Sequence, residues 1–439
     1  MNTTQVQEVL NNLKITALND MQQASLKEFD KPNDLVILSP TGSGKTLAFL
    51  LPILSWLKQD VKGVQALILS PSRELSIQIE SVFKSMGTPF KINACYGGHP
   101  FKTEQNNLSQ APAVLVGTPG RLADHIRRKS FDPSTVTLLI LDEFDKALEF
   151  GFEKDMTSII AECPSITKRI LTSATKPAEI SSFTGIKNPI ELNYISASAT
   201  PKGLSLLSVI ADGHDKIEVL FKLLCSLSAG TALVFCNHRD AVDRISELLK
   251  AKGIKHGVFH GGLEQVERER ALIKFRNGSH NILVTTDLAA RGLDIPNIKH
   301  VVHYQLPLTE DAYIHRSGRT ARMNEVGTAY LVLAEGETYP KYLKEKATVF
   351  HVDEVLTLPA LPDWETLYIS AGKKDKINKV DIVGLVLQKA ALAKEDLGLI
   401  EVQDNASYVA IKRDKIQAVL TLIRNEKIKK QKVKMDIAR

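Results

Sequence analysis

LVILSPTGSGKTLAFLLPILSWL, residues 35–57, decides the fold of the first part of this chain. The apolar run 35–38 predicts a strand, and the apolar run 47–57 predicts a helix. Between them, SPTGSGKT at 39–46 is rich in glycine and places a lysine and a threonine at the start of the helix. A strand, a glycine-rich turn and a helix N-terminus together predict an α/β domain that binds phosphate groups.

The chemistry of this phosphate loop (residues 39–46) follows from its residue types. Gly42 and Gly44 allow tight backbone curvature, so that N–H groups point at phosphate oxygens while Lys45 neutralises the outer phosphates. The Thr46 hydroxyl is suited to bind Mg²⁺. Ser39 replaces the first glycine of the usual pattern, and a polar turn between two buried elements is the alternative interpretation. The predicted contacts of the loop are Ser39, Gly42, Ser43, Gly44, Lys45 and Thr46.

A second charged segment, DEFD at 142–145, follows the short apolar run 137–141. Such a run is typical of a parallel strand buried on both faces, and it delivers two acids at its end. Asp142 is suited to hold a metal ion, and Glu143 to orient or deprotonate an attacking water. Two acids after a strand are also common as a charge pair at a helix N-terminus. With the phosphate loop upstream, the combination predicts a nucleoside triphosphatase that uses Mg²⁺.

The composition limits the other possibilities. A length of 439 residues suggests two to four domains, with 44% hydrophobic and 24% charged residues as in ordinary globular proteins. The net charge of +6 permits nucleic-acid binding without proving it. The apolar run 47–57 is too short to span a bilayer, and the N-terminal residues lack the apolar core of a signal peptide. We therefore expect a soluble cytoplasmic protein that does not bind membranes.

Candidate metal ligands outside the phosphate site are few. The four cysteines, at positions 95, 163, 225 and 236, are widely separated and form no CxxC pair. They predict neither a zinc site nor a disulfide framework, which fits a reducing cytoplasm. His256 and His260 flank a segment that reads as a strand end, and we do not expect them to bind metal.

Strand-like apolar runs alternate with helical stretches in both halves of the chain, which predicts two α/β units with parallel sheets. In such sheets the ligand lies beyond the carboxyl ends of the strands, where the polar motifs fall. Residues 196–205 have the composition of a linker. A second break, rich in proline, follows at 357–363, and a module of roughly 75 residues comes after it.

The third segment that carries chemistry is HRSGRTAR at 315–322. In this order, the segments resemble the DEAD-box ATP-dependent RNA helicases from about residue 21 to residue 334. The other motifs behind the resemblance are PSREL (71–75), a glycine pair (97–98), TPGR (118–121), SAT (173–175), LVFCN (233–237), QVER (265–268) and TTDLAARGLD (285–294). The resemblance implies two tandem RecA-like parallel-sheet domains, residues 1–195 and 204–350, and a small α+β domain at 364–439.

The resemblance also assigns roles. ATP is expected between the two RecA-like domains, where Arg319 and Arg322 would stabilise transition-state charge on closure. The other expected ATP contacts are Gln22, Lys45, Thr46, Asp142, Glu143 and Asp294. RNA is expected across both domains, held by its phosphates and 2′-hydroxyls. The expected RNA contacts are Arg73, Gly98, Thr118, Gly120, Arg121, Arg268 and Thr286. The residues expected to couple the two sites are Asp145, Ser173, Thr175 and His315.

Two departures from the family pattern stand out. Phe144 occupies the position of an alanine, but all three acids of DEFD remain, so hydrolysis is expected. Gln22 lies at the family's distance from Lys45, yet LNDM replaces the proline and threonine usual before it, and no aromatic residue stands upstream. This departure bears on adenine specificity and not on hydrolysis.

The terminal module reads as strand, helix, strand, strand, helix, with a final strand from the basic tail. It resembles an RNA-recognition-motif (RRM) fold, and specifically the carboxyl-terminal domain of DbpA-type DEAD-box proteins, over residues 367–434. Tyr368 and Tyr408 occupy two base-stacking positions, and Ala406 the third. Lysines fill one loop, at 373, 374, 376 and 379, and the tail, at 427, 429, 430, 432 and 434. The resemblance implies targeting to large-subunit ribosomal RNA or pre-ribosomal particles.

The sequence thus predicts a monomeric RNA-dependent ATPase and helicase that separates short duplexes during ribosomal RNA maturation. An RNA clamp or annealing chaperone, which uses ATP binding to regulate its grip, is the alternative from another functional class. The acids at 142 and 143 with the arginines at 319 and 322 favour the enzyme. A DNA translocase is a third interpretation, disfavoured by the tail and by the motif set.

Overall fold

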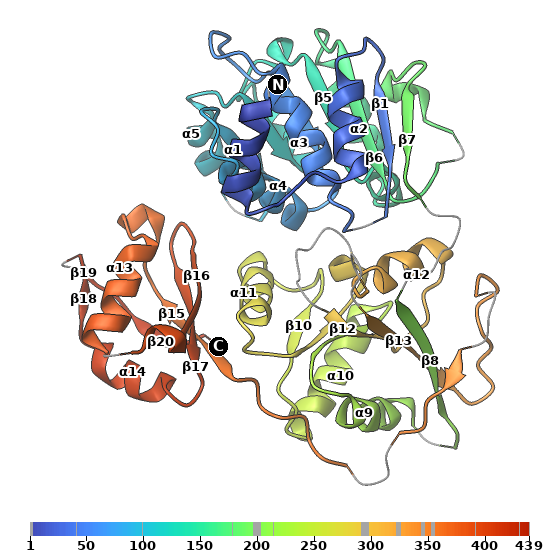
Figure 1. Cartoon of the computed structure of the whole chain (residues 1–439), viewed down its shortest axis with the longest axis vertical. Helices are drawn as coiled ribbons and strands as arrows, with labels where there is room; N and C mark the ends of the chain where they lie inside the picture. Colours follow the sequence, from blue (N-terminus) through green and yellow to red (C-terminus); the bar gives the residue numbers. More distant parts are fainter. Residues whose placement is uncertain are drawn as a thin grey trace. The chain divides into compact units, whose positions relative to one another are not determined.

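The computed structural model describes residues 3–40, 42–98, 100–177, 179–195, 203–213, 215–290, 298–321, 326–343, 347–352, 356–390, 392–429 and 431–438. Asp294 and Arg322, two predicted site residues, lie outside the described residues, as does most of the predicted linker. The described residues form two compact units, 3–195 (unit 1) and 203–438 (unit 2). Figure 1 shows the helices and strands of each.

In its described residues, unit 1 contains a seven-stranded parallel sheet in the order β3-β4-β2-β5-β6-β1-β7. Its strands are β1 Leu35–Leu38, β2 Ala66–Leu69, β3 Ile92–Cys95, β4 Val114–Gly117, β5 Leu138–Leu141, β6 Lys168–Ser173 and β7 Ile190–Asn193. Its helices are α1 Thr3–Leu13, α2 Asp20–Phe29, α3 Lys45–Trp56, α4 Arg73–Ser85, α5 Phe101–Leu108, α6 Pro119–Arg127, α7 Phe144–Glu149 and α8 Glu153–Ala161, with 3₁₀ turns η1 Pro133–Thr135 and η2 Ser182–Thr184.

The apolar runs form central strands because both faces of the sheet are covered. Leu35 and Ile37 of β1 pack into one hydrophobic cluster, together with residues of α2, α3 and α4. Val36 and Leu38 pack into another, with residues of α6, α7 and α8. A strand buried on both faces needs apolar residues at every position, which is why no alternation appears in its sequence.

Unit 2 begins with a second RecA-like sheet, seven-stranded and parallel among the residues described, in the order β10-β11-β9-β12-β13-β8-β14. Its strands are β8 Leu204–Ala211, β9 Thr231–Phe235, β10 Gly257–Phe259, β11 Ile282–Thr285, β12 Ile298–His303, β13 Gly327–Ala334 and β14 Thr348–Val349. Its helices are α9 Lys216–Ser226, α10 Arg239–Ala251, α11 Gln265–Arg276 and α12 Glu310–Ser317, with the 3₁₀ turn η3 Asp287–Ala290. Leu204 and Ser205, predicted to belong to the linker, start β8.

The rest of unit 2 is the C-terminal module (residues 364–438). Its antiparallel sheet has the order β16-β17-β15-β20. Its elements are β15 Trp364–Ile369, η4 Lys373–Asp375, α13 Lys379–Gly384, the π-helical turn η5 Leu385–Lys389, η6 Lys394–Asp396, β16 Leu397–Val402, β17 Ser407–Lys412, α14 Ile416–Ile423, β18 Lys427–Ile428, β19 Gln431–Lys432 and β20 Met435–Ile437. Two tandem parallel-sheet domains followed by a small α+β domain confirm the predicted fold class.

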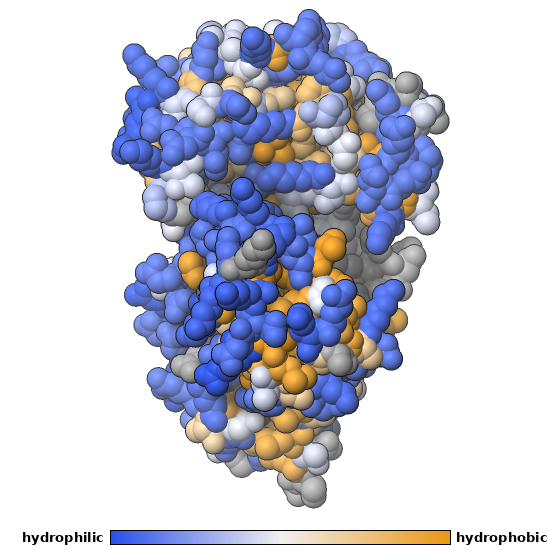
Figure 2. Space-filling view, turned by 90° about the vertical axis from the view of Figure 1, so that its left-hand side faces the viewer, coloured by the Kyte–Doolittle hydropathy of each residue, from blue (hydrophilic) through white to orange (hydrophobic). Residues whose placement is uncertain are grey.

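No helix among the described residues is both long and apolar enough to cross a bilayer. Hydrophilic residues spread over much of the surface in Figure 2, with hydrophobic residues gathered mainly in the lower half of the view. The exposed hydrophobic side chains of the module include Val380, Leu399 and Leu422.

Candidate active site and nucleic-acid interface

The phosphate loop connects β1 to the first residue of α3, as predicted. Gly42 and Gly44 adopt the left-handed backbone, with φ of 82° and 89°. A Cβ atom on Gly44 would lie 2.6 Å from the side-chain nitrogen of Gln22. Glycine is therefore required at position 44 both by its backbone angle and by the close approach of a neighbouring side chain.

Lys45 is turned back over the loop that precedes it. Its buried ammonium donates hydrogen bonds to the carbonyl oxygens of Ser39, at 2.6 Å, and Pro40, at 3.0 Å. The Ser39 hydroxyl donates to the Ser43 hydroxyl at 2.7 Å, which closes the loop at its base. These contacts hold the positive charge of Lys45 within the curve of the loop, where outer phosphates are predicted.

Gln22 contacts the phosphate loop directly. Its side-chain nitrogen donates to the Gly44 carbonyl at 3.2 Å, while its side-chain oxygen accepts from the Asn19 N–H at 3.0 Å. Asn19 in turn donates to the Ser43 carbonyl at 2.9 Å and caps α2. The segment that departs from the family pattern therefore braces the loop through a capping box. The contact of Gln22 with adenine stays a prediction.

The two predicted catalytic acids lie at the end of β5 and are both buried. The Thr172 hydroxyl of β6 donates to the Asp142 carboxylate at 2.6 Å and accepts from the Glu143 N–H at 3.1 Å. Glu143 has a φ of 46°, a left-handed conformation that is strained for a residue with a side chain. Burial, reinforced by the neighbouring Glu143 carboxylate, raises the pKa of Asp142.

The predicted coupling residues in unit 1 are Asp145, Ser173 and Thr175, and they connect the DEFD segment to the phosphate loop. The Thr175 hydroxyl donates to the Asp145 carboxylate at 3.1 Å. The Ser173 hydroxyl donates to the Thr175 carbonyl at 2.6 Å, and the Ser173 carbonyl accepts from the Ser39 N–H at 3.0 Å. Hydrogen bonds thus join the segments that follow β5, β6 and β1.

The predicted RNA contacts of unit 1 come together from three separate segments. Arg73 packs against the glycine pair, because a Cβ on Gly97 would lie 3.2 Å from its guanidinium. Gly98 is exposed, and Thr118 and Gly120 at the start of α6 are partly exposed. These positions are accessible to a nucleic-acid backbone, which is the kind of contact predicted for them.

Arg121 is less accessible, since its side chain is only 15% exposed. Its guanidinium donates to the Glu104 carboxylate at 2.6 Å and lies 4.9 Å from the centre of the Phe101 ring. His125 also contacts Glu104, at 2.7 Å, and stacks on Phe101. Arg121 is therefore anchored within unit 1, and sequence reasoning missed the residue that anchors it.

Glu104 is the centre of this anchor. Burial by itself raises the pKa of Glu104, but the hydrogen bonds from His125 and Arg121 outweigh it and hold the pKa below its ordinary value. The Cys95 thiol lies close to Glu104 and His125, and these three side chains are near enough to one another to form a potential metal-binding group. Burial raises the pKa of the Cys95 thiol, however, and the ion pair with Arg121 already uses the carboxylate. We interpret the cluster as structural.

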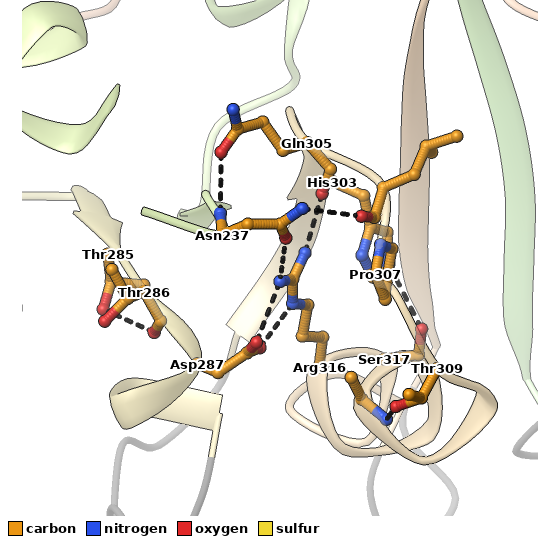
Figure 3. Close-up of polar contacts among 12 residues, drawn as sticks. Asn237, Thr285, Thr286, Asp287, His303, Gln305, Pro307, Thr309, Arg316 and Ser317 are labelled. Carbon is orange, nitrogen blue, oxygen red and sulfur yellow. Dashed lines mark hydrogen bonds and ion pairs between the residues drawn. The ribbon is translucent and has the colours of Figure 1, made fainter. Parts of the chain in front are cut away.

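In unit 2, Arg316 of the HRSGRTAR segment is completely buried. Its guanidinium contacts both carboxylate oxygens of Asp287, at 2.5 and 3.0 Å, the Gln305 carbonyl at 2.7 Å and the Asn237 side chain at 2.7 Å (Figure 3). These partners follow β11, β12 and β9. Arg316 thus links its own segment to two other predicted motifs, LVFCN and TTDLAARGLD, a role that the sequence analysis did not assign to it.

The remaining predicted residues of the second RecA-like domain differ in exposure. His315 and Arg319 are buried, and so is Arg268 of α11, which donates to the Gln265 side chain. Thr286 is partly exposed, and the neighbouring Thr285 hydroxyl donates to the Phe259 carbonyl at 2.7 Å. Thr286 is the predicted RNA contact here that a ligand can reach.

The structure corrects the expectation for Tyr408 of the module. Its side chain is only 2% exposed and packs against Ile273 of α11 and against Ala438. A ring covered in this way has no face on which a base can stack. Tyr368, whose ring centre lies 5.6 Å from that of Tyr408, is partly exposed and keeps its predicted role as a proposal.

Comparisons with known proteins match all three parts of the chain. Family models match residues 19–183 (DEAD/DEAH box helicase), 215–324 (helicase conserved C-terminal domain) and 366–437 (DbpA RNA binding domain). The ATP-dependent RNA helicase DbpA of Bacillus subtilis is 31% identical, with 98% of this chain and 96% of the relative covered. DbpA of Escherichia coli is also 31% identical, with 92% and 91% covered.

A similarity to solved structures agrees with these matches. Dbp5 of Saccharomyces cerevisiae, bound to RNA and ADP BeF3, superposes with a TM-score of 0.68 at 26% identity. The alignment covers 79% of this chain and 93% of that one. The similarity in fold to this RNA-bound protein therefore extends over most of the chain.

We predict that Arg316→Lys destabilises unit 2. A lysine keeps the charge but cannot reach Asp287, Asn237 and Gln305 together, so the free energy of unfolding should fall by about 2 to 3 kcal/mol. The change is measured by urea unfolding, followed by tryptophan fluorescence, in a chain that also carries Trp56→Phe. Trp364 is then the one tryptophan left, and it lies in unit 2. The exposed Arg244→Lys change is the matched control. Equal stability of the two variants would contradict the buried network.

We predict that Glu104→Gln destabilises unit 1 by about 3 to 5 kcal/mol, because Arg121 loses a buried countercharge. Urea unfolding in a Trp364→Phe background lets Trp56 report on this unit alone. The control is Glu153→Gln, at an exposed position of α8, which should unfold like the parent chain. A Glu104 variant as stable as this control would rule out the anchor.

Proposed function

This chain belongs to the DEAD-box ATP-dependent RNA helicases and carries a DbpA-type RNA-binding domain, and on that premise we propose that it remodels large-subunit ribosomal RNA during ribosome assembly. Members of this family hydrolyse ATP and bind RNA. The choice of ribosomal RNA is the step that we add. The observation that carries it is the match of residues 366–437 to the DbpA RNA binding domain, a module that also presents exposed lysines for general affinity to RNA.

This lysine surface joins two segments that are far apart in the chain. It comprises Lys373, Lys374, Lys376, Lys379, Lys427, Lys429 and Lys432, all of which are exposed. The Lys429 ammonium donates to the Lys376 carbonyl at 2.6 Å and contacts the Asp381 carboxylate at 2.9 Å. The hairpin β18–β19 is thereby held against the loop before α13. Seven exposed lysines in these two segments, of which Lys374 and Lys429 pair with Asp404 and Asp381, suit a folded RNA, whose phosphates are dense and closely spaced.

In unit 1, the proposed roles in hydrolysis follow from the geometry of the phosphate loop and the acids. Lys45 is proposed to contact the outer phosphates, and Glu143 to orient the attacking water. The strained backbone of Glu143 is held by the hydrogen bond from its N–H to the Thr172 hydroxyl. Asp294, Arg319 and Arg322 are proposed to complete the ATP site.

The donor set at this site fits Mg²⁺. Asp142 supplies a carboxylate and Thr46 a hydroxyl, the oxygen ligands that this ion prefers. The raised pKa of Asp142 reflects a buried carboxylate that a nearby cation would stabilise in its ionised form. When bound, the ion would neutralise negative charge on the phosphates. Thr46 and Asp142 are the residues proposed to hold it.

The proposed setting is the cytoplasm, where the chain would act as a monomer on pre-ribosomal particles. The module would select the RNA, while Arg73, Gly98, Thr118, Gly120 and Thr286 of the RecA-like domains would hold its backbone. Contacts to phosphates and 2′-hydroxyls carry no base information, so selection must come from the module.

We predict that Glu143→Gln keeps ATP and RNA binding but lowers RNA-stimulated turnover by about 100-fold or more, because contacts to the phosphates survive while activation of water does not. Phosphate release and RNA affinity are measured on the full chain. Glu162→Gln, at an exposed position after α8, is the control and should match the parent. Turnover within about threefold of the parent would overturn the role of Glu143.

We predict that large-subunit ribosomal RNA dominates the RNA crosslinked to the full chain in cells. In vitro, the chain should bind a structured fragment of that RNA more tightly than an unrelated hairpin of equal length. The double change Lys374→Ala and Lys432→Ala should weaken the binding of both RNAs. It should also lower the slope of log affinity against log salt concentration by about 2 units, roughly one per lysine. Lys154→Ala, exposed on α8, is the control. Crosslinks mainly to messenger or small-subunit ribosomal RNA would refute the proposal.

A further inference from the structure

The module is docked onto α11 of the second RecA-like domain through the face of its sheet that carries the tyrosines. In β15, Leu367 and Ile369 point into the core of the module, so Thr366 and Tyr368 lie on the opposite face. Ile273 of α11 packs there against Tyr408 and Ala438. The apolar centre of this interface explains why Tyr408 is buried.

Polar contacts fix the docked arrangement around this apolar centre. The Lys274 ammonium donates to the Ala438 carbonyl at 2.8 Å, and the Asn277 side chain donates to the Thr366 hydroxyl at 3.1 Å. At the other side, Arg276 contacts Glu401 at 3.1 Å. The polar contacts therefore come from the last turn of α11 and from Asn277, the residue that follows it.

A cavity of about 230 Å³ remains open beside this interface, at the edge of the sheet formed by β20. Tyr368 lies directly opposite Asp436 in the pairing of β15 with β20. Side chains alternate along a strand, so Lys434 and Ala438 share the face of Asp436. The lining residues are Arg270, Tyr368, Lys434, Asp436, Ile437 and Ala438. The second RecA-like domain supplies Arg270, and the module supplies the rest.

We infer that this cavity binds one unpaired nucleotide of the RNA, and that Arg270 and Tyr368 hold it together from the two domains. An aromatic ring beside two cations suits a base and its phosphate, and a carboxylate accepts hydrogen bonds from amino or imino groups of a base. Two cations and one carboxylate leave a net positive charge, which favours an anionic ligand. This inference rests on the proposed role of the module in selecting RNA.

Tyr408 takes a different part in this site from the stacking role that the sequence predicted. Arg270 forms a hydrogen bond with the Tyr408 hydroxyl. The buried tyrosine therefore positions the arginine and does not contact a base. Removing its hydroxyl alone should affect the nucleotide through Arg270, whereas a stacking residue would tolerate the change to phenylalanine.

The test measures binding of the full chain to a labelled single-stranded RNA decamer and to a blunt duplex of the same sequence, by fluorescence anisotropy without ATP. Arg270→Ala and Tyr368→Ala should each weaken decamer binding by about 5- to 100-fold and leave the duplex unaffected. Their effects should not add, because one nucleotide uses both contacts. Tyr408→Phe should weaken decamer binding too, and Arg270→Lys should retain part of it.

Two matched controls separate this site from docking and from general charge. Arg276→Ala removes a docking contact that does not line the cavity, and Arg424→Ala removes an exposed charge after α14. Both should bind the decamer like the parent chain. An Arg276 variant as weak as the Arg270 variant would assign the effect to docking and overturn the inference. Displacement of the decamer by micromolar uridine monophosphate would assign the cavity to free nucleotides instead.

Failure here is distinguishable from failure of the proposed function. If Arg270→Ala and Tyr368→Ala bind the decamer like the parent while crosslinking still recovers large-subunit ribosomal RNA, the nucleotide site is wrong and the proposed function stands. If the variants lose the decamer while other RNA is recovered, the site stands and the choice of ribosomal RNA is wrong.

Discussion

Strands of a parallel sheet end on the same edge, and the chemistry of this protein depends on that constraint. In unit 1, β6 lies between β1 and β5, so the phosphate loop, the SAT segment and the predicted catalytic acids become neighbours although they are far apart in the chain. The backbone bond from Ser39 to Ser173 and the bond from Thr172 to Asp142 then fasten the three segments. A shift in one segment must be accommodated by the next, which is a short physical route for coupling within this unit.

The buried charges discussed above differ in how many hydrogen-bond partners and opposite charges surround them. Arg316 and Glu104 each have several charged or polar partners at hydrogen-bond distance, as a buried ion needs. Asp142 has a raised pKa, because burial and a second carboxylate outweigh the hydrogen bond from Thr172. Removing one partner of a fully partnered buried charge destabilises the fold, whereas a buried carboxylate with a raised pKa is poised to gain from a bound cation.

The sequence predicted the fold class and the central strands, since runs such as 35–38 and 138–141 are apolar at every position. It did not indicate β3 and β7, whose residues at the sheet edges are partly exposed and mixed in polarity. The motif residues of the phosphate loop and the acids came together as expected. Arg316 as a link and Glu104 as an anchor were missed because their roles depend on partners distant in sequence. The burial of Tyr408 was missed for the same reason, since a helix of another domain covers it.

Helix α11 connects the module, which is proposed to select the RNA, with the second RecA-like domain. The residues of α11 that face the module, Arg270, Ile273 and Lys274, recur at helical spacing, so one face of the helix serves the interface. Arg268, in the predicted RNA-binding motif, lies two positions before Arg270 and therefore on another side of the same helix, where it is buried and donates to Gln265. A nucleotide held at the module would thus act on a helix whose other residues, such as Leu272 and Phe275, are buried in the RecA-like domain. A displacement of α11 at its module-facing side must therefore be accommodated by the residues packed on its other side, which is a physical route from the module to the RecA-like domain.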